Sequence, residues 1–493
     1  MKPITVVTSN PHEATLSALM ASGLIDQGVF LTEESVHFNI PNGFVQVVAQ
    51  PLFSYKTLHS ILKRLQTEYL LLIVEPHPLA FEPRALERLL EAAKLTKAGM
   101  VYSDFYDQGQ NTKKLHPLNA YQPGSVRDDF NFGPMFLFSA HAVQKALNQF
   151  GPIPEVHWAG LYDLRLKISM DHAVHHLAEP IYSIMKTHES TGNEKVFNYL
   201  DPKNRAAQKE MEAVFTDYLK RINAYLPPPL NRVEHSPEPF PVEASVIVPV
   251  RNRKETVGEA LRSALSQKTN FSFNVVVVDN HSTDGTTDLL SNLARTHHQI
   301  KLIIPEKKDL GIGGCWNEAI HHQSCGRYAI QLDSDDLYSS PHTLQKMVDM
   351  LRQGKFAMVI GSYTVVDFNL REIPPGLIDH REWTDDNGHN NALRINGLGA
   401  PRAFNTELIR KIGFLNVSYG EDYAAALRIC REYQVGRIYE SLYLCRRWSG
   451  NTDARLTPEE ENLKNAFKDK IRTEEILTRQ KMVKERNTES LSQ

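Results

Sequence analysis

The chain has 493 residues, of which 41% are hydrophobic and 23% charged, and this composition excludes a disordered or fibrous protein. Its 55 basic and 58 acidic side chains nearly balance, so we expect no overall attraction to nucleic acid or to an anionic membrane surface. The four cysteines lack CxxC spacing, which excludes a disulfide scaffold and a four-cysteine zinc site and favours a reducing compartment.

The N-terminal sequence, MKPITVVTSN, has too few consecutive apolar residues for a signal peptide. No stretch approaches the roughly 18 apolar residues of a membrane-spanning helix. We therefore expect a soluble, cytoplasmic protein, and peripheral contact with the inner face of the membrane stays open.

Two segments predict the domain boundaries. Residues 226–241 (LPPPLNRVEHSPEPFP) are rich in proline, which fixes φ and favours an extended linker. Residues 457–493 are highly charged with apolar residues at helical spacing, which predicts a C-terminal helix that ends in a frayed tail. These segments leave a first domain over residues 1–225 and a second over residues 242–456.

The two halves share three short similarities in the same order, which predicts two copies of one domain. The pairs are EYLLL (68–72) with RYAIQ (327–331), GLYDLRLKI (160–168) with GEDYAAALRI (420–429), and IYSIMKTHESTGN (181–193) with LYLCRRWSGNT (442–452).

In the second half, short β-rich apolar runs alternate with stretches of helical spacing. Strands are predicted at 244–250, 274–278, 301–304 and 328–332, and helices at 256–266, 286–296 and 314–322. This alternation predicts an α/β, Rossmann-like domain with a mainly parallel sheet flanked by helices.

The first predicted strand ends in polar residues (VIVPVRNR, 246–253). Ligands of open parallel sheets bind beyond the carboxyl ends of the strands, although a plain polar turn would also explain this segment. The candidate ligand contacts are Val248, Pro249, Arg251 and Asn252.

Asp279 ends the valine-rich strand of VVVVDNHSTDGTTDLL (275–290). Its carboxylate could accept the imino hydrogen of a uracil or another base, whereas turn and helix-capping chemistry explains the Ser-Thr-Asp-Gly sequence that follows.

A glycine loop follows in DLGIGGCWNEAI (309–320). Gly311 and Gly313 would let the backbone approach a phosphate at a helix N-terminus. A dinucleotide fingerprint is excluded, because Trp316 stands where the third glycine belongs.

The acidic cluster of QLDSDDLY (331–338) directly follows an apolar strand. Asp333, Asp335 and Asp336 would repel one another unless a cation relieves the repulsion. One or two carboxylates together with substrate phosphates suit Mg²⁺ or Mn²⁺, and the alternative is an N-cap for the helix that begins near Pro341.

Three later segments complete the set. NGLGAP (396–401) predicts a tight loop near a ligand. YGEDYAAALRI (419–429) places Glu421 and Asp422 at the start of a helix. Asp422 could act there as a general base, or the helix dipole could simply stabilise the two carboxylates. LCRRWSGNT (444–452) offers Arg446 and Arg447 as phosphate partners beside Trp448, or as solvated surface charges.

Taken in order, these motifs resemble the family 2 glycosyltransferases, which have the GT-A nucleotide-sugar-binding fold. The resemblance extends over residues 245–452. It implies that Asp279 reads the nucleotide base, that Asp333 contacts the ribose or sugar, and that Asp335, with Asp333, holds the metal. It further implies that Asp422, beside Glu421, is the inverting base and that Arg446 or Arg447 contacts the diphosphate or acceptor. Asn317 matches an asparagine of the family's glycine loop, whereas that loop begins DLG where the family often has Asn or Lys.

The expected function is a metal-dependent inverting glycosyltransferase of the hexosyl or N-acetylhexosaminyl type, acting in polysaccharide biosynthesis with Mn²⁺ or Mg²⁺. The donor would be a nucleotide-sugar, UDP-linked by default, and the acceptor a hydroxyl of a glycan or lipid-linked molecule. Homo-oligomerisation stays open, as does a non-catalytic nucleotide-sugar- or glycan-binding protein.

The first half resembles the same fold without its chemistry. Glu75-Pro76-His77-Pro78 stands where the second half has its acidic cluster, and Leu161 falls near the catalytic position. A degenerate GT-A-like domain is therefore favoured, and a bifunctional enzyme that uses Glu75, His77 and Asp163 stays open.

Overall fold

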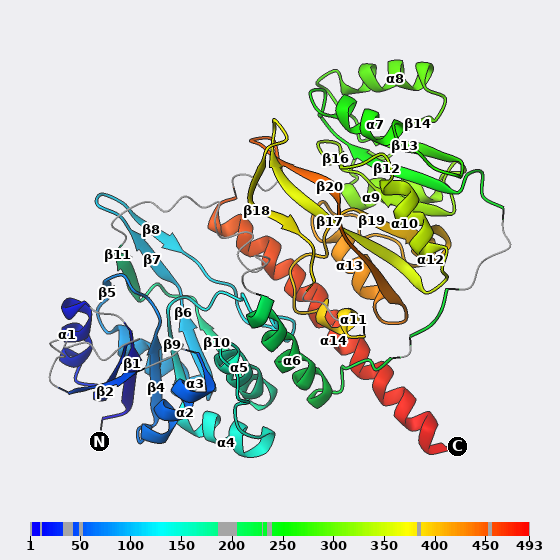
Figure 1. The fold of residues 1–493 in the computed structure, drawn as a ribbon. Coiled ribbons are helices and arrows are strands. Elements are labelled where there is room, and N and C mark those ends of the chain that lie inside the picture. Colours follow the sequence, from blue (N-terminus) through cyan, green and yellow to red (C-terminus); the bar gives the residue numbers. More distant parts are fainter. Residues whose placement is uncertain are drawn as a thin grey trace. The chain divides into compact units, whose positions relative to one another are not determined.

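The computed structural model forms two compact units, which we call unit 1 and unit 2 (Figure 1). Unit 1 comprises Met1–Val196, Ala206–Ala224 and Leu456–Ile476, and unit 2 comprises Phe197–Arg205, Tyr225–Arg455 and Leu477–Gln493. The residues described are 2–9, 12–32, 43–48, 53–185, 205–228, 230–233, 239–381, 386–451 and 456–492. Parts of the predicted linker (226–241) and of the similar segments 181–193 and 442–452 lie outside these residues.

Unit 1 alternates strands and helices along its chain. Its elements are β1 (Ile4–Thr8), α1 (Glu13–Ala21), β2 (Ile25–Thr32), β3 (Phe44–Val48), α2 (Tyr55–Arg64), β4 (Tyr69–Ile73), β5 (Leu79–Phe81), α3 (Ala85–Thr96), β6 (Met100–Ser103), β7 (Phe105–Gln108), β8 (Lys113–His116), β9 (Met135–Ser139), α4 (Ala140–Phe150), α5 (Gly160–Asp171), β10 (Val174–Leu177), β11 (Tyr182–Met185) and α6 (Arg205–Arg221).

Unit 2 repeats this alternation. Its elements are β12 (Ala244–Val250), α7 (Val257–Leu265), β13 (Phe273–Asp279), α8 (Thr286–Thr296), β14 (Ile300–Ile303), α9 (Ile312–His321), β15 (Tyr328–Gln331), β16 (Leu337–Tyr338), α10 (Thr343–Leu351), β17 (Phe356–Asp367), β18 (Glu372–Ile378), α11 (Gly388–Asn391), β19 (Arg402–Asn405), α12 (Thr406–Ile412), α13 (Glu421–Ile429) and β20 (Gln434–Arg447).

Unit 1 has a small sheet of order β5-β11-β7-β8 beside its main sheet, and the main sheets of the two units share one strand order. Unit 1 runs β3-β2-β1-β4-β9-β6-β10, and unit 2 runs β14-β13-β12-β15-β19-β17-β20 before its short β16. In each unit the first four strands are parallel, the fifth is antiparallel to both neighbours, and the last two pair in parallel. The predicted fold class, two tandem α/β units with sheets flanked by helices, is therefore confirmed.

The apolar runs that predicted strands form the centre of unit 2. The four consecutive valines of β13 are fully buried, since strands covered on both faces need apolar side chains in both directions. The chain ends in α14 (Pro458–Ser492), whose residues up to Ile476 belong to unit 1 and whose later residues belong to unit 2. Among the described residues no helix is long and apolar enough to span a bilayer.

Candidate active site

The carboxyl ends of β12, β13 and β15 meet at one edge of the sheet of unit 2, because these strands are parallel neighbours. The loops after β12 and β13 are joined there. The backbone N–H of Asn252 donates to Ser282 Oγ at 2.9 Å, and Thr283 N–H donates to Asn252 Oδ1 at 2.8 Å. Arg251 is exposed beside them, whereas Pro249 is half-buried and Val248 lies fully inside the core. The Val248 side chain therefore packs in the core, and contact between its backbone and a ligand stays a prediction.

The carboxylate of Asp279 is fully buried and already bonded within its own turn. Its Oδ1 accepts from the N–H and Oγ–H of Ser282, at 3.1 and 2.6 Å, and its Oδ2 accepts from the Thr287 hydroxyl. The next residue differs, because Asn280 donates to Leu310 O at 2.7 Å while its Oδ1 is buried without a hydrogen-bond partner among the described residues. Asp279 Oδ2 has a second acceptor site, but because the side chain is fully buried, contact between Asp279 and a base would require the turn to move.

The glycine loop packs against the segment that precedes α13. A Cβ at Gly313 would lie 1.9 Å from Leu415 O, and one at Gly311 would lie 2.5 Å from the carbonyl carbon of Val417. Asn317 holds the same segment, accepting from Phe414 N–H at 2.9 Å and donating to Phe414 O at 2.8 Å. These residues therefore fix the start of α13, and phosphate contact at the two glycines stays a prediction.

Asp333 lies directly beyond β15, half-buried. Its carboxylate oxygens accept from Gln331 Nε2 at 3.1 and 3.0 Å, and its N–H donates to the Tyr443 hydroxyl at 2.9 Å. Burial raises the pKa of Asp333, and Arg402 opposes this rise. Arg402 is thus close enough to Asp333 to stabilise its charge.

Asp335 and Asp336 continue the acidic cluster with different surroundings. Asp335 Oδ2 accepts from Trp448 Nε1 at 3.2 Å and lies 3.7 Å from Arg253 Nε. Asp336 is buried, and burial together with the charges of Asp333 and Asp335 raises its pKa well above the usual range. Asp336 accepts from Arg446 N–H at 2.8 Å, so it shapes the loop, while Asp333 and Asp335 keep partial exposure.

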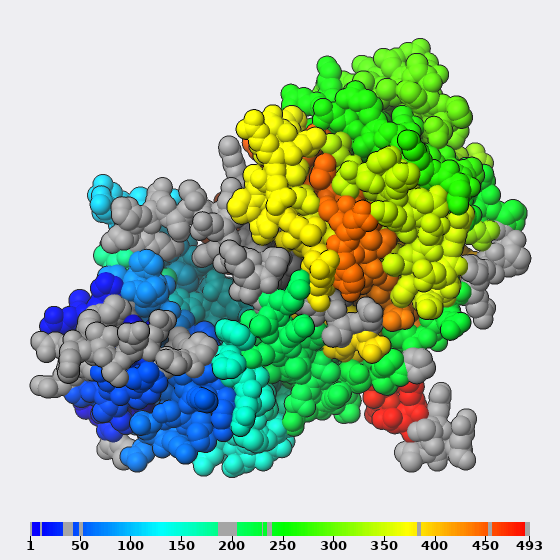
Figure 2. Space-filling model, viewed as in Figure 1, coloured from blue at the N-terminus to red at the C-terminus, as the bar shows by residue number. Residues whose placement is uncertain are grey.

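The two arginines of β20 have different environments. Arg446 is 1% exposed, and its guanidinium donates to Asp335 O and to the Glu259 carboxylate. Arg447 is half-buried and pairs in register with Asp367 of β17. Figure 2 shows β20, in orange, beside the yellow β17–β18 region on the face in view. Arg446 therefore holds the acidic loop, and Arg447 is the more accessible of the two.

Glu421 and Asp422 begin α13, but they differ in access. Glu421 is 8% exposed, and its Oε2 has no hydrogen-bond partner in the described part of the chain. Burial and the adjacent Asp422 raise the pKa of Glu421 to about 8. The Asp422 side chain is 30% exposed, and its Oδ2 lies 2.8 Å from Arg402 Nη2. Of the two, Asp422 is the carboxylate that a substrate can reach.

Arg402 is the residue that the sequence analysis missed. It begins β19, donates to Gly399 O at 2.8 Å, and receives its strongest charge interactions from Asp422 and Asp333. Its backbone N–H donates to Gln331 Oε1 at 3.3 Å. Because Gln331 Nε2 donates to the Asp333 carboxylate, the Gln331 side chain connects Arg402 to Asp333. It directly follows the loop 396–401, and only the pairing of β19 with β15 reveals its place.

Asp333 and Asp335 fit a divalent cation that takes its other ligands from a donor diphosphate. Both are carboxylates with partial exposure, and no other side chain needs to join them in that mode. No group of three or more His, Cys, Asp or Glu residues with metal-ligand spacing occurs over the described ranges.

The structure thus brings together the segments that carry Arg251 and Asn252, the Asp333–Asp335 pair and, through Arg402, Asp422.

Residues 245–412 match the family model described as "Glycosyl transferase family 2". The poly(ribitol-phosphate) beta-glucosyltransferase of Bacillus spizizenii is 23% identical over 237 residues, which cover 47% of this chain and 36% of that protein. The putative teichuronic acid biosynthesis glycosyltransferase TuaG of Bacillus subtilis is 28% identical over 122 residues, 25% of this chain and 47% of that protein.

Solved structures resemble the chain over a similar span. Residues 1–349 of Staphylococcus aureus TarS in complex with UDP-GlcNAc are 24% identical with a TM-score of 0.37, covering 48% of this chain and 72% of that one. This chain spans less than half the length of each of the two curated relatives named above. Over residues 245–412, unit 2 is therefore similar to glycosyltransferase family 2.

Proposed function

We propose that unit 2 transfers a sugar from a nucleotide-sugar to an acceptor hydroxyl with inversion, and that Asp422 is the general base. The observation that carries this proposal is the Arg402 bridge, which holds an accessible Asp422 next to Asp333 at the end of β15. General-base catalysis needs a carboxylate that is both ionised and reachable. The buried, largely protonated Glu421 meets neither condition near neutral pH.

In the proposed step, the acceptor oxygen forms a bond to the anomeric carbon while the bond from that carbon to the diphosphate oxygen breaks. Asp422 takes the hydroxyl proton, and Arg402 keeps Asp422 oriented and charged. Asp333 and Asp335 would hold Mn²⁺ or Mg²⁺, which when bound neutralises charge on the leaving diphosphate. Asp335 is oriented for this role by Trp448 and Asn451.

Unit 1 lacks the corresponding groups when the sheets are aligned by register. Ile4 pairs with Tyr69 as Ala244 pairs with Tyr328, so positions 333 and 335 correspond to Val74 and Pro76. In the same way Tyr69 pairs with Ser139 as Tyr328 pairs with Asn405, so Arg402 corresponds to Phe136.

The helix that bears the base in unit 2 corresponds to α5 in unit 1. Tyr162 and Tyr423 both donate their hydroxyl to a backbone carbonyl, and this match puts Leu161 at the position of Asp422. Asp163 instead pairs with Lys167 at 2.7 Å, and Glu210 accepts from the N–H groups that precede α5. These contacts support a single donor site per chain over the bifunctional alternative.

The donor we propose is UDP-linked, and the acceptor is a glycan or a lipid-linked molecule of a polysaccharide pathway. Two curated relatives bear glycosyltransferase names that refer to poly(ribitol-phosphate) and to teichuronic acid, which supports a polymer acceptor. A non-catalytic glycan-binding protein is less well supported, because unit 2 keeps every carboxylate of the site.

The test is calorimetric titration of the full chain with UDP, GDP and dTDP, each with and without Mn²⁺. We expect Mn²⁺-dependent binding of one nucleotide at one site per chain. Asp335→Ala should weaken it by at least about 10-fold, whereas Asp349→Ala, an exposed residue of α10, should not change it.

Donor turnover then separates an enzyme from a binding protein. Asp422→Asn should bind the nucleotide-sugar as the wild type does while transfer falls by about 10²–10⁴-fold. Metal-independent binding, or binding unchanged by Asp335→Ala, would contradict the proposed donor site. Unchanged transfer in Asp422→Asn would show that Asp422 is not the general base.

A further inference from the structure

The second half of α14 buries an arginine against a short helix of unit 2. Arg479 is 0% exposed, and it donates to Asn390 Oδ1 at 3.2 Å and to His389 O at 3.1 Å. Burying a guanidinium costs free energy that hydrogen bonds only partly offset. Arg479 therefore links α14 to α11 in a defined geometry.

Helix α11 is also bonded to Leu226, which shares Asn390 Oδ1 with Arg479. Asn390 donates to Leu226 O at 3.0 Å and accepts from Leu226 N–H at 3.1 Å. His389 Nε2 lies 2.7 Å from the same carbonyl oxygen, and burial lowers the pKa of His389 to about 4, so the neutral ring donates this bond. The short helix therefore has little freedom to move.

The residue that follows α11 is bonded to the helix of the proposed base. Tyr423 is 2% exposed, and its hydroxyl donates to Ala392 O at 2.7 Å. Neighbouring residues of an α-helix point about 100° apart. Because Tyr423 directly follows Asp422, fixing Tyr423 in the core fixes the direction in which Asp422 points.

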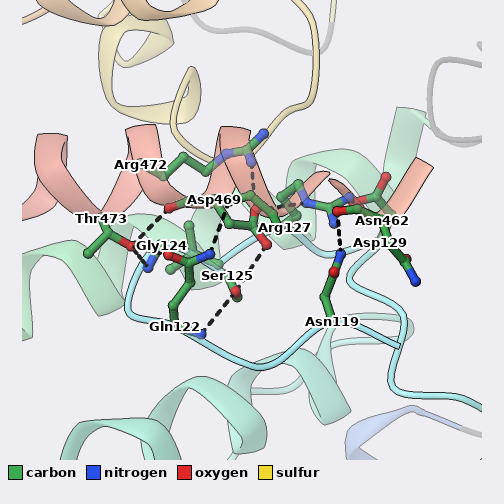
Figure 3. A network of polar contacts seen from close by, with 12 residues as sticks. Asn119, Gln122, Gly124, Ser125, Arg127, Asp129, Asn462, Asp469, Arg472 and Thr473 are labelled. Carbon is green, nitrogen blue, oxygen red and sulfur yellow. Dashed lines mark hydrogen bonds and ion pairs between the residues drawn. The ribbon is translucent and has the colours of Figure 1, made fainter. Parts of the chain in front are cut away.

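Unit 1 contains the same arrangement without a base. The Tyr162 hydroxyl donates to Val126 O, and the adjoining loop is bonded to the first half of α14 (Figure 3). There Ser125 Oγ donates to Asp469 Oδ2 at 3.0 Å, and Gly124 N–H donates to Thr473 Oγ1 at 2.8 Å. In each unit α14 thus supports the loop to which the tyrosine of the following helix is bonded.

We propose that Arg479 is a positioning residue for catalysis, acting through α11, Ala392 and Tyr423 on the orientation of Asp422. The proposal rests on the proposed function of Asp422 as the base. It predicts that the chain beyond Ile476 contributes to the rate of sugar transfer although it supplies no group to the reaction. A displacement of about 1 Å at a reacting group can lower a rate by about 10²-fold.

The test compares Arg479→Met, Tyr423→Phe, the double variant and the control Arg486→Met, an exposed arginine of the same helix. The assay is Mn²⁺-dependent hydrolysis of UDP-sugars, in which water replaces the acceptor. We expect kcat to fall by about tenfold or more in each single variant while KM for the donor stays within about twofold. The kcat of the double variant should be no lower than that of the more impaired single variant, because both substitutions interrupt the same series of contacts between Arg479 and Asp422.

Hydrogen exchange tests, without substrate, whether Arg479 and Tyr423 stabilise the start of α13. Backbone amides at the start of α13 should exchange faster in Arg479→Met and in Tyr423→Phe, and at the wild-type rate in Arg486→Met. Unchanged exchange there, an unchanged kcat, or additive effects in the double variant would overturn the proposal. Should Arg479→Met fail to fold, Tyr423→Phe decides, since it removes a single hydroxyl. A wild type without turnover but with the expected exchange pattern would instead refute the proposed function.

Discussion

Replacing Glu421 by glutamine tests whether the Glu421 carboxyl is protonated in the folded protein. Burial and Asp422 raise the pKa of Glu421 from its ordinary 4.5 to about 8, so at neutral pH the folded protein keeps this side chain protonated. Glutamine has the shape of the protonated acid and carries no charge. We therefore expect Glu421→Gln to fold, to bind donor and to retain transfer at neutral pH, unlike Asp422→Asn.

The larger effect should appear in the pH dependence of stability. Because the folded state binds the Glu421 proton more tightly than the unfolded state, this residue's contribution is fully present below about pH 4.5 and is lost as the pH rises through about 8. One such proton changes the free energy of unfolding by about 1.4 kcal/mol per pH unit. Over this window the loss is at most on the order of 5 kcal/mol, and Glu421→Gln should lack it.

The assay is urea denaturation of the full chain between about pH 5 and pH 8, read by hydrogen exchange of β13 and β15 so that only unit 2 is followed. Wild type should lose stability relative to Glu421→Gln as the pH rises. Glu440→Gln, which changes an exposed carboxylate of the same unit, should run parallel to wild type. Parallel curves for wild type and Glu421→Gln would show that Glu421 is ionised in the folded state and would refute this reasoning.

Three further changes test other parts of the structure. Arg402→Gln should lower transfer by at least about tenfold by releasing Asp422, whereas Arg352→Gln, which also breaks an ion pair of 2.8 Å in unit 2, should leave transfer unchanged in a donor-turnover assay. Gly313→Ala should destabilise unit 2 by about 1–3 kcal/mol or more in urea denaturation, since its Cβ would overlap a backbone oxygen. Asp469→Asn should destabilise unit 1 by about 3–5 kcal/mol by the same method, because it removes the buried negative charge that pairs with both Arg127 and Arg472.

The sequence predicted the elements of unit 2 closely where the signal is local. The strand predicted at 244–250 and the helix predicted at 286–296 have those bounds in the structure, and the strand predicted at 274–278 extends by one residue at each end. Helix α9 starts two residues earlier than its predicted bound, at Ile312, because Gly311 serves as its N-cap. Apolar runs and capping residues determine such bounds without knowledge of the tertiary fold.

The site was predictable only in part, because its decisive contacts join distant segments. Nothing in the sequence near Arg402 indicates that it faces Asp422 and Asp333, since that follows from the antiparallel pairing of β19 with β15. Likewise the motif around Asp279 cannot reveal that its carboxylate is bonded to Ser282 and Thr287. Residue types predicted the chemistry of the site, and only the packing separates groups that can meet a ligand from groups that hold the loops.

The pairing of charges is a physical reason to expect that unit 1 lacks the chemistry proposed for unit 2. The Arg402 side chain is only 14% exposed, and Asp422 and Asp333 compensate its charge, while Arg402 in turn stabilises the charge of each carboxylate. Removing one partner of such a group leaves a buried uncompensated charge, which costs about 3–5 kcal/mol. The corresponding positions of unit 1 are all apolar: Val74, Pro76, Phe136 and Leu161.

The contacts that unit 1 retains are those that need no site charge. Ser139 and Asn405 occupy the same register position and both cap the following helix, and the tyrosine bonds to Val126 and Ala392 are present in both units. Such contacts stabilise the fold whether or not a substrate binds. The charged groups of the proposed site depend on one another, and we therefore expect unit 1, whose corresponding positions are apolar, to keep the fold without them.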